Sequence, residues 1–157
     1  MIIILRSRLF SFNSDFPDTI KITNTLRLKK SEVGFVGRLL GRISKKMKEK
    51  QNNFVFYSLI LNQEEIGNIQ FCKNSDTEIY GNWLQIDDEY RGKGYATETL
   101  RTLISIFRKM GFSEMTLDVP DNSPDARHIY NKLGFKEVEY LGTDPVWGGL
   151  TKMRLKL

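Results

Sequence analysis

The stretch Arg91-Gly92-Lys93-Gly94-Tyr95-Ala96 decides the fold, because a predicted strand precedes it and a predicted helix follows it. Its glycines allow the backbone to turn so that successive N–H groups face one point. The start of the helix adds a partial positive charge, and the Arg and Lys side chains add full charges. A plain glycine-rich connection is the alternative, but this context favours a phosphate-binding loop.

Two better-known phosphate-binding loops do not fit this stretch. The sequence contains no Gly-x-x-x-x-Gly-Lys-Ser/Thr pattern, which nucleoside triphosphatases use. The third glycine of the dinucleotide-binding Gly-x-Gly-x-x-Gly pattern is also missing, because residue 97 is Thr. The loop therefore predicts a phosphate-bearing ligand of another kind.

Hydrophobic periodicity on both sides of the loop predicts an α+β domain with one sheet. The expected strands cover residues 54–61, 66–72, 77–86, 115–119, 136–141 and 151–157, and the expected helices cover 96–110 and 126–133. Gly81 predicts a bulge or a close backbone approach inside its strand. That strand is expected to present Tyr80, Asn82, Leu84 and Ile86 on one face. The strand–helix–strand unit over residues 80–119 should form a right-handed parallel crossover.

The N-terminal third is harder to interpret. Residues 1–12 are compatible with a strand, and the alternating residues 20–28 with a strand or the start of a helix. Residues 31–50 have helical periodicity, with apolar side chains on one face and Lys and Arg on the other. Three glycines in this segment predict a helix that is bent, mobile or split in two.

Length and composition indicate a single globular domain over 157 residues, 40% of them apolar and 27% charged. A single Cys and a single His exclude an intramolecular disulfide and a Cys/His zinc cluster, so no metal is expected. No apolar run approaches the ~20 residues of a membrane-spanning helix. We therefore expect a cytoplasmic protein with no membrane partner.

The net charge of +5 is concentrated in residues 1–50, which hold twelve Lys or Arg against four Asp or Glu. Such a basic segment suggests an anionic partner, either nucleic acid, an acidic protein or a phosphate-bearing cofactor. The alternative is a solvated cationic helix face.

Two motifs together resemble a known family. Arg91-x-x-Gly94-x-Ala96 fits the Gln/Arg-x-x-Gly-x-Gly/Ala motif of the GNAT N-acetyltransferase superfamily, which uses acetyl-CoA. Downstream, Ala126-x-x-x-Tyr130-x-Lys132-Leu133-Gly134-Phe135 is similar to the family's Ala-x-x-x-Tyr-x-Lys-x-Gly-Phe helix end. The spacing of the motifs and the order of the elements agree over roughly residues 54–140.

The resemblance implies one mixed, mostly antiparallel sheet with helices on both faces and a splayed parallel strand pair that holds CoA. It also implies one domain over residues 1–157, with an acetyl-CoA-binding core over 54–140. Residues 1–50 match nothing in the family and are expected to form a divergent acceptor-side region.

The resemblance also assigns cofactor contacts. The CoA pyrophosphate would lie on the amides of Arg91, Gly92, Lys93, Gly94, Tyr95 and Ala96. The pantetheine would run between the strands 77–86 and 115–119, with the acetyl group near the backbone N–H groups of Leu84, Gln85 and Ile86. Many members carry Asn where this sequence has Ser123, and Asn122 is shifted by one residue. Ser123 is still able to hydrogen-bond pantetheine.

Three residues are candidates for proton transfer. Tyr130 matches the family's general-acid tyrosine, and a core tyrosine is the alternative. Asp118 precedes it by twelve residues and resembles a base glutamate of ribosomal-protein N-terminal acetyltransferases, although it could be a solvated strand-end carboxylate. Glu78 is the other candidate base.

The expected function is transfer of an acetyl group from acetyl-CoA to a primary amine, which could be a protein N-terminus, a lysine or a small amine. One alternative is a GNAT-like protein directed to nucleic acid through residues 21–50. Another is a non-catalytic acyl-CoA-binding protein. The basic segment favours an acidic protein partner over a cationic small molecule. The protein could be a monomer or a homodimer, and Trp147 could pack at an interface or line the acceptor site.

Overall fold

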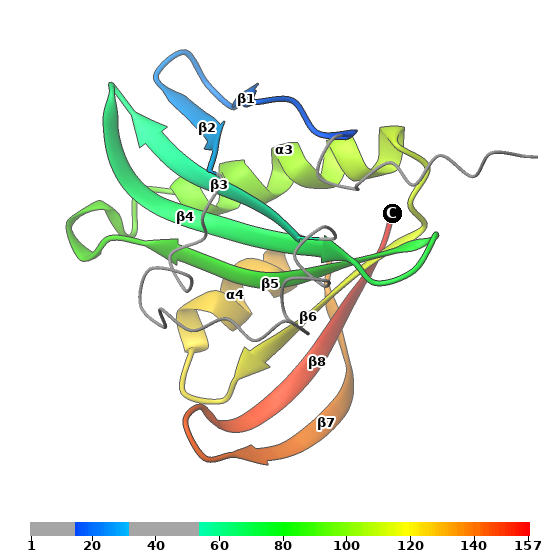
Figure 1. The fold of residues 1–157 in the computed structure, drawn as a ribbon. Helices are drawn as coiled ribbons and strands as arrows, with labels where there is room; N and C mark the ends of the chain where they lie inside the picture. Colours follow the sequence, from blue (N-terminus) through cyan, green and yellow to red (C-terminus); the bar gives the residue numbers. More distant parts are fainter. Residues whose placement is uncertain (1–14, 32–53) are drawn as a thin grey trace, which may run out of the picture.

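A computed structural model of the chain describes residues 15–31 and 54–157 (Figure 1). The strand predicted over residues 1–12 lies outside the described residues. So does the helix predicted over residues 31–50, apart from Ser31.

The described residues form one eight-stranded sheet with the order β1-β2-β3-β4-β5-β6-β8-β7 (Figure 1). Among these described strands β5 and β6 form the only parallel pair, and every other neighbouring pair is antiparallel. The strands are β1 (Thr19–Lys21), β2 (Leu26–Lys30), β3 (Phe54–Leu61), β4 (Glu64–Lys73), β5 (Glu78–Ile86), β6 (Glu114–Pro120), β7 (Lys136–Asp144) and β8 (Gly148–Lys156). This arrangement confirms the predicted mixed, mostly antiparallel α+β sheet.

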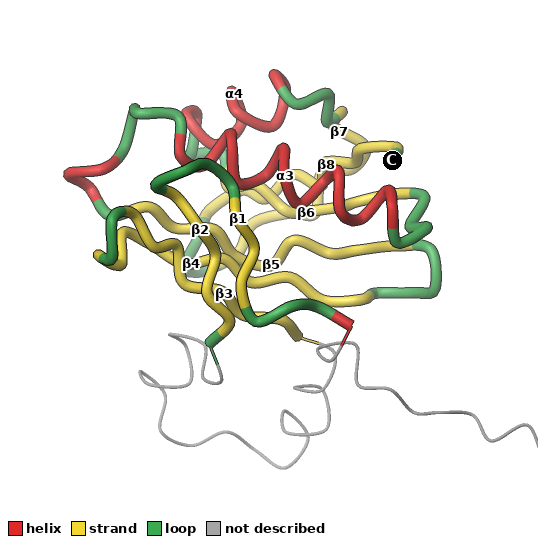
Figure 2. The backbone as a smooth tube through the Cα atoms, turned by 90° about the horizontal axis from the view of Figure 1, so that it is seen from above, coloured by secondary structure: helices red, strands yellow, loops and turns green. Residues whose placement is uncertain are grey.

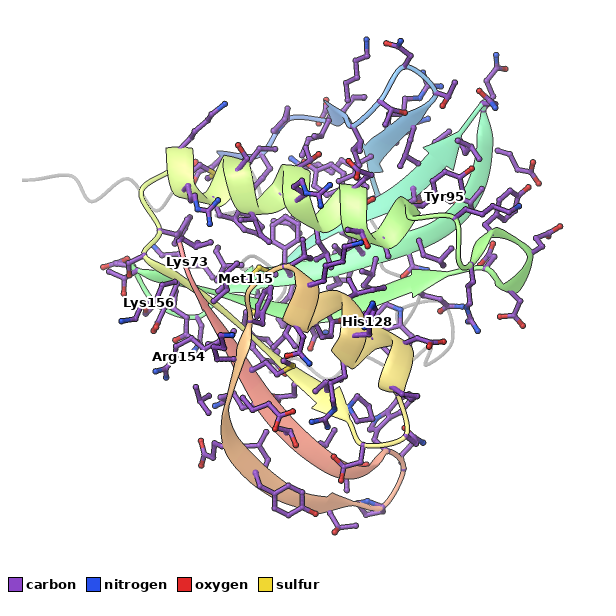
Figure 3. The ribbon with its side chains drawn as sticks, turned by 180° about the vertical axis from the view of Figure 1, so that it is seen from behind. Lys73, Tyr95, Met115, His128, Arg154 and Lys156 are labelled. Carbon is purple, nitrogen blue, oxygen red and sulfur yellow. The ribbon has the colours of Figure 1, made fainter. Side chains whose placement is uncertain are left out.

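Two helices follow the parallel strands, at nearly the predicted positions. They are α3 (Tyr95–Lys109) and α4 (Pro124–Lys132), and a short 3-10 helix η2 (Asp88–Tyr90) precedes the glycine loop. Helix α4 begins earlier than predicted because Pro124 occupies its first turn, where proline is tolerated. Both helices cover the same face of the sheet, which we call the helix face (Figures 2 and 3).

Residues 20–28 belong to a hairpin of two short strands, so the strand alternative is confirmed in two pieces and the helix start is wrong. The backbone N–H groups of Ile22 and Thr23 both donate to the carbonyl of Leu26, at 3.0 and 2.9 Å. Thr23 Oγ1 also accepts the N–H of Leu26 at 2.9 Å. This local hydrogen bonding by a threonine hydroxyl favours a turn over a continuous strand.

A β-bulge in β5 changes which of its side chains share a face. Phe71 pairs with Gly81 and Gln70 with Trp83, so Asn82 has no partner in β4. The bulge predicted at Gly81 is therefore present, one residue later. Because the bulge shifts the alternation, Tyr80 and Trp83 share one face, and Gly81 and Leu84 share the other. The prediction that Tyr80, Asn82, Leu84 and Ile86 share a face is therefore wrong.

The parallel pair is short and then separates. Strands β5 and β6 pair only from Glu78↔Glu114 to Gly81↔Leu117. Beyond this point β5 continues to Ile86 and β6 to Pro120 without pairing with each other. The predicted splayed strand pair is thus confirmed, and among the described residues one edge of β5 has no strand partner after Gly81.

Aromatic packing fixes α3 on the sheet. The ring of Phe107 is fully buried, with its centroid 5.0 Å from that of Phe71 in β4 and 6.1 Å from that of Phe16. Leu100, Leu103 and Ile104 are buried on the same helix. Burial of such side chains contributes about 1.5–3 kcal/mol each and holds α3 against the sheet. In this position the N-terminus of α3 lies beside the splayed strands.

Strands β7 and β8 form a longer hairpin than predicted, with residues 145–147 as the turn. Asp144 Oδ1 accepts the backbone N–H groups of Val146 at 2.7 Å and Trp147 at 2.9 Å. This side-chain cap closes the turn, so the residues on both sides pair as strands.

Two glycines of the β4–β5 region provide a matched test of this packing. A Cβ on Gly67 would clash with the backbone oxygen of Gln85, whereas the tightest contact of a Cβ on Gly81 would be with the terminal methyl of Met115, at 3.1 Å. We expect Gly67→Ala to lower the free energy of unfolding by about 3 kcal/mol and Gly81→Ala by about 1 kcal/mol, because a methionine side chain yields more easily than backbone. Urea denaturation measures both. Equal losses would contradict the β4–β5 register.

Candidate active site

A pocket of about 440 Å³ lies where β5 and β6 separate. From the helix face it is lined by Leu84, Leu100, Ala126 and Tyr130. From the opposite face of the sheet it is lined by Tyr80, Trp83, Asp118 and Trp147. The pocket therefore reaches both faces of the sheet through the gap between the two strands.

The predicted phosphate loop lies between η2 and the start of α3. Gly92 and Gly94 have φ of 72° and 85°, in the left-handed region that favours glycine. The first hydrogen bond within α3 runs from the N–H of Glu98 to the carbonyl of Gly94, at 3.0 Å. The earlier N–H groups of the helix therefore have no acceptor within it, and they offer donors to an anion.

Arg91 braces this loop as well as adding charge to it. Its Nε donates to the carbonyl of Ile86 at 2.9 Å, and its Nη1 lies 2.8 Å from Asp88 Oδ1. Lys93 Nζ lies 5.3 Å from the centre of the Tyr90 ring. Arg91 thus ties the loop to the end of β5, with its charge partly balanced by Asp88.

Tyr130 lines the pocket from α4. Its ring centroid lies 5.6 Å from that of Phe135, at the end of the same sequence motif. Burial raises the pKa of the Tyr130 phenol above its ordinary value of 10.0. The phenol is consequently protonated at neutral pH and able to donate a hydrogen bond or a proton.

Asp118 lines the pocket from β6, opposite the helices. Its Oδ2 accepts a hydrogen bond from the Tyr80 hydroxyl at 2.8 Å. Its Oδ1 is buried and has no hydrogen-bond partner among the described residues. Burial, followed by the bond to Asp118, raises the pKa of Tyr80, so Tyr80 remains a donor. One carboxylate oxygen is thereby held in place, and the other has no hydrogen-bond partner among the described residues.

Glu78 does not line the pocket. Its Oε2 accepts from the Asn74 amide at 2.9 Å, and its Oε1 is hydrogen-bonded to Thr116 Oγ1. These contacts lie where β5 and β6 are still paired, away from the gap. Of the two predicted base candidates, only Asp118 is brought to the same pocket as Tyr130.

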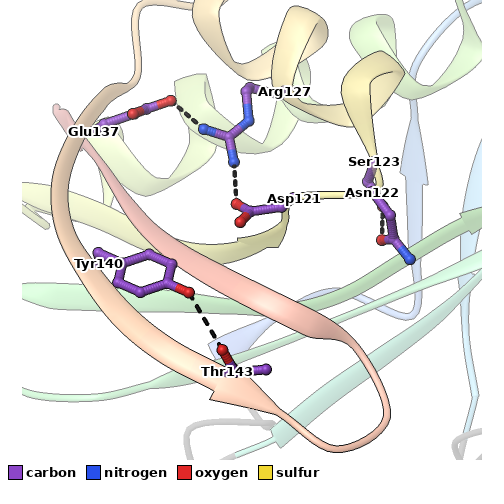
Figure 4. Close-up of polar contacts among 7 residues, drawn as sticks. All are labelled: Asp121, Asn122, Ser123, Arg127, Glu137, Tyr140 and Thr143. Atoms are coloured by element: carbon purple, nitrogen blue, oxygen red, sulfur yellow. Dashed lines mark hydrogen bonds and ion pairs between the residues drawn. The ribbon is translucent and has the colours of Figure 1, made fainter.

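Some of the other predicted cofactor contacts line the pocket and some do not. Leu84 and Ser123 line the pocket, whereas Gln85, Ile86 and Asn122 do not. Asn122 is exposed, and its Oδ1 lies 3.5 Å from Ser123 Oγ (Figure 4).

Sequence reasoning did not single out Trp83. This side chain reaches the pocket because the bulge at Asn82 turns it onto the face of Tyr80. There its ring packs edge-on against Trp147, with 5.9 Å between centroids. The bulge signal at Gly81 could have identified Trp83 only if the position of the extra residue had been known.

A charged clamp supports the hairpin that carries Trp147 (Figure 4). Arg127 of α4 donates to Asp121 at 3.0 Å and also pairs with Glu137 of β7. The backbone N–H of Asp121 donates to the carbonyl of Gly149 in β8 at 2.8 Å. Helix α4, the end of β6 and the β7–β8 hairpin are thereby connected around the pocket.

The family model of the acetyltransferase (GNAT) family matches residues 28–135. The chain belongs to this family. Human N-acetyltransferase 8B is 39% identical over 54 residues, which make up 34% of this chain and 24% of that protein. The chain thus matches about a quarter of the length of that relative.

Solved structures show the same GNAT fold at low identity. The acetyl transferase from Salmonella typhimurium that modifies the N-terminal serine of ribosomal protein L7/L12 has a TM-score of 0.69 at 12% identity, covering 88% of this chain and 99% of that chain. A GNAT family acetyltransferase from Elizabethkingia anophelis with acetyl-CoA bound has a TM-score of 0.70 at 13% identity, covering 86% and 100%.

None of the helices in the described part of the chain is long and apolar enough to cross a membrane. Residues 15–31 and 54–157 also contain no group of three or more His, Cys, Asp or Glu side chains that could hold a metal ion.

Proposed function

We propose that the chain is an N-acetyltransferase that transfers the acetyl group of acetyl-CoA directly to a primary amine. One observation carries the proposal. The gap between β5 and β6 brings a protonated Tyr130 to one side of a pocket and an unpaired oxygen of Asp118 to the other. Direct transfer needs an acid for the leaving sulfur and a base for the attacking amine, on opposite sides of the reacting carbonyl.

The residues on the helix face fit acetyl-CoA. The first N–H groups of α3 and the dipole of its 15 residues suit the pyrophosphate, and Lys93 adds a cation beside them. The unpaired edge of β5 offers backbone groups to the amides of pantetheine, as a third strand would. Ser123 lies on the α4 side of the same pocket and can add a hydrogen bond.

The acetyl group is transferred in one displacement. The amine nitrogen attacks the thioester carbonyl carbon, forming the new C–N bond while the C–S bond breaks. Asp118 Oδ1 accepts the proton that the amine loses, and the Tyr130 hydroxyl gives a proton to the departing sulfur. The products are an N-acetyl amide and free CoA, and solvent restores the two protonation states.

Backbone donors stabilise the charge that develops on the carbonyl oxygen. Because no strand in the described part of the chain pairs with β5 on its β6 side after Gly81, N–H groups near Leu84 are free to point at this oxygen. Donors fixed in a pocket that excludes water contribute about 2.7–4 kcal/mol each to such steps.

The proposals for the protein's partner and its location rest on the sequence alone. An acidic protein acceptor and a cytoplasmic location are proposals that rest on the basic residues 1–50 and on the composition. Docking on nucleic acid is the rival use of the basic segment, and it predicts an affinity that falls steeply as salt is raised.

The phosphate role of the glycine loop can be tested by a substitution at Gly94. Gly94→Ala places a Cβ in open space at a φ of 85°. The substitution therefore costs about 1–2 kcal/mol of conformational energy, which comes from the left-handed backbone alone. Gly111→Ala is the matched control, with a φ of 89° and equally open space, at the other end of α3. Calorimetric titration should show CoA affinity reduced about tenfold or more in Gly94→Ala and unchanged in Gly111→Ala. Equal affinities would contradict the phosphate role of the loop.

The role of Tyr130 as the proton donor can be tested by removing its hydroxyl. Tyr130→Phe should lower kcat about 100-fold because the leaving sulfur loses its acid, while the affinity for acetyl-CoA changes little. Tyr140→Phe is the control, since Tyr140 is 60% exposed on β7, and its kcat should equal that of the wild type. A Tyr130→Phe variant with unchanged kcat would exclude the acid role.

The pH dependence follows from the same assignment. Because burial raises the pKa of Tyr130 above 10.0, the phenol remains protonated at pH 9. Wild-type kcat should therefore not fall between pH 7 and pH 9. A fall over this range that Tyr130→Phe abolishes would contradict the assignment.

A further inference from the structure

Two buried polar atoms on one side of the pocket have no hydrogen-bond partner among the described residues. One is the donor Nε1 of Trp83, and the other is the acceptor Oδ1 of Asp118. A third such atom, Thr99 Oγ1, belongs to α3, and Thr99 does not line the pocket. Buried polar groups in folded proteins are nearly always paired, so these two atoms indicate a ligand that pairs with both.

The local structure leaves the two atoms without a partner among the described residues. The Tyr80 hydroxyl occupies Asp118 Oδ2 and leaves Oδ1 without a donor. The bulge at Asn82 sets Trp83 on the same face as Tyr80, and both Trp83 and Asp118 line the pocket. A ligand on this face meets one acceptor and one donor within a single pocket.

We propose that the acceptor is an α-amino carbonyl compound with an apolar side chain, such as an amino-acid amide or the first residue of a peptide. Its amine N–H donates to Asp118 Oδ1, and its neighbouring carbonyl accepts from Trp83 Nε1. This inference rests on the proposed acetyl transfer and specifies the amine that receives the acetyl group.

The indole of Trp147 forms the apolar part of the acceptor site. It packs edge-on against Trp83 and is 44% exposed, so its free surface is available to an apolar side chain. The two hydrogen bonds to Asp144 fix the turn that carries it. Leu150 of β8 lines the same pocket and extends the apolar surface.

A lysine side chain or a polyamine satisfies only half of this arrangement. Its amine can donate to Asp118, but no carbonyl lies close to that amine, so Trp83 Nε1 stays buried and unpaired. A site that contains an unpaired buried donor discriminates strongly against the ligand that fails to satisfy it.

Three acceptors and two variants test the proposal. Leucinamide has the α-amine, the carbonyl and an apolar side chain, whereas isoamylamine is the same molecule without its carboxamide. Nα-acetyl-lysinamide has an amine far from any carbonyl. For each acceptor, kcat/KM is measured by the release of CoA in the wild type, Trp83→Phe and Trp147→Phe. Calorimetric titration of each variant with acetyl-CoA provides the binding control.

Trp83→Phe keeps an aromatic ring and removes the N–H. We expect the ratio of kcat/KM for leucinamide to that for isoamylamine to fall about tenfold in Trp83→Phe. The ratio in Trp147→Phe should remain that of the wild type, because this variant weakens both acceptors alike. Comparing ratios between variants cancels the different basicities of the two amines. The wild type should also acetylate leucinamide faster than Nα-acetyl-lysinamide.

Several outcomes would overturn the inference. A ratio that is unchanged in Trp83→Phe would remove the role of Nε1, and so would a preference for Nα-acetyl-lysinamide. Binding of acetyl-CoA without transfer to leucinamide would contradict the acceptor class while leaving the acetyl-CoA site intact. No binding of acetyl-CoA would instead overturn the proposed function on which the inference rests.

Discussion

The separation of β5 from β6 after Gly81 is the constraint on which the rest of the site depends. If a parallel pair stayed hydrogen-bonded along its whole length, its backbone N–H and C=O groups would pair with each other, and no gap would open in the sheet. In this chain the bulge at Asn82 bends β5 at the point where pairing stops. The gap therefore follows from the register and the limited extent of the β5–β6 pairing. It gives ligands access to the sheet from both faces.

The two faces of the gap have different chemistry because different elements supply them. The helix face receives the N-terminus of α3 and the Tyr130 phenol, which suit an anionic, sulfur-bearing cosubstrate. The opposite face receives Asp118 and the two tryptophans, which suit an amine beside apolar surface. Packing of Phe107 against Phe71 fixes α3, while the Arg127 clamp connects α4 to the hairpin of Trp147. Stability and site geometry thus depend on the same contacts.

Much of this arrangement could be predicted from the sequence. The loop 91–96 and the order of strands and helices after residue 54 have strong local signals, because glycine, capping and periodicity act over a few residues. The Tyr130 motif lies within one short helix, so it could also be predicted from the local sequence. The side-chain faces of β5 were predicted wrongly, because a bulge shifts every later residue and its exact place depends on pairing with β4. Glu78 and Asp118 looked equivalent in sequence, and only the extent of β5–β6 pairing separates them. Trp83 was missed for the same reason.

Hydrogen exchange with and without acetyl-CoA, read by mass spectrometry, tests the account most directly. We expect slower exchange in peptides that cover residues 82–97, which contain the unpaired edge of β5 and the loop before α3. Peptides from the β1–β2 hairpin should exchange at an unchanged rate, since that hairpin lies at the far edge of the sheet. Saturating acetyl-CoA that leaves exchange over residues 82–97 unchanged would contradict the claim that the splayed strands hold the cosubstrate.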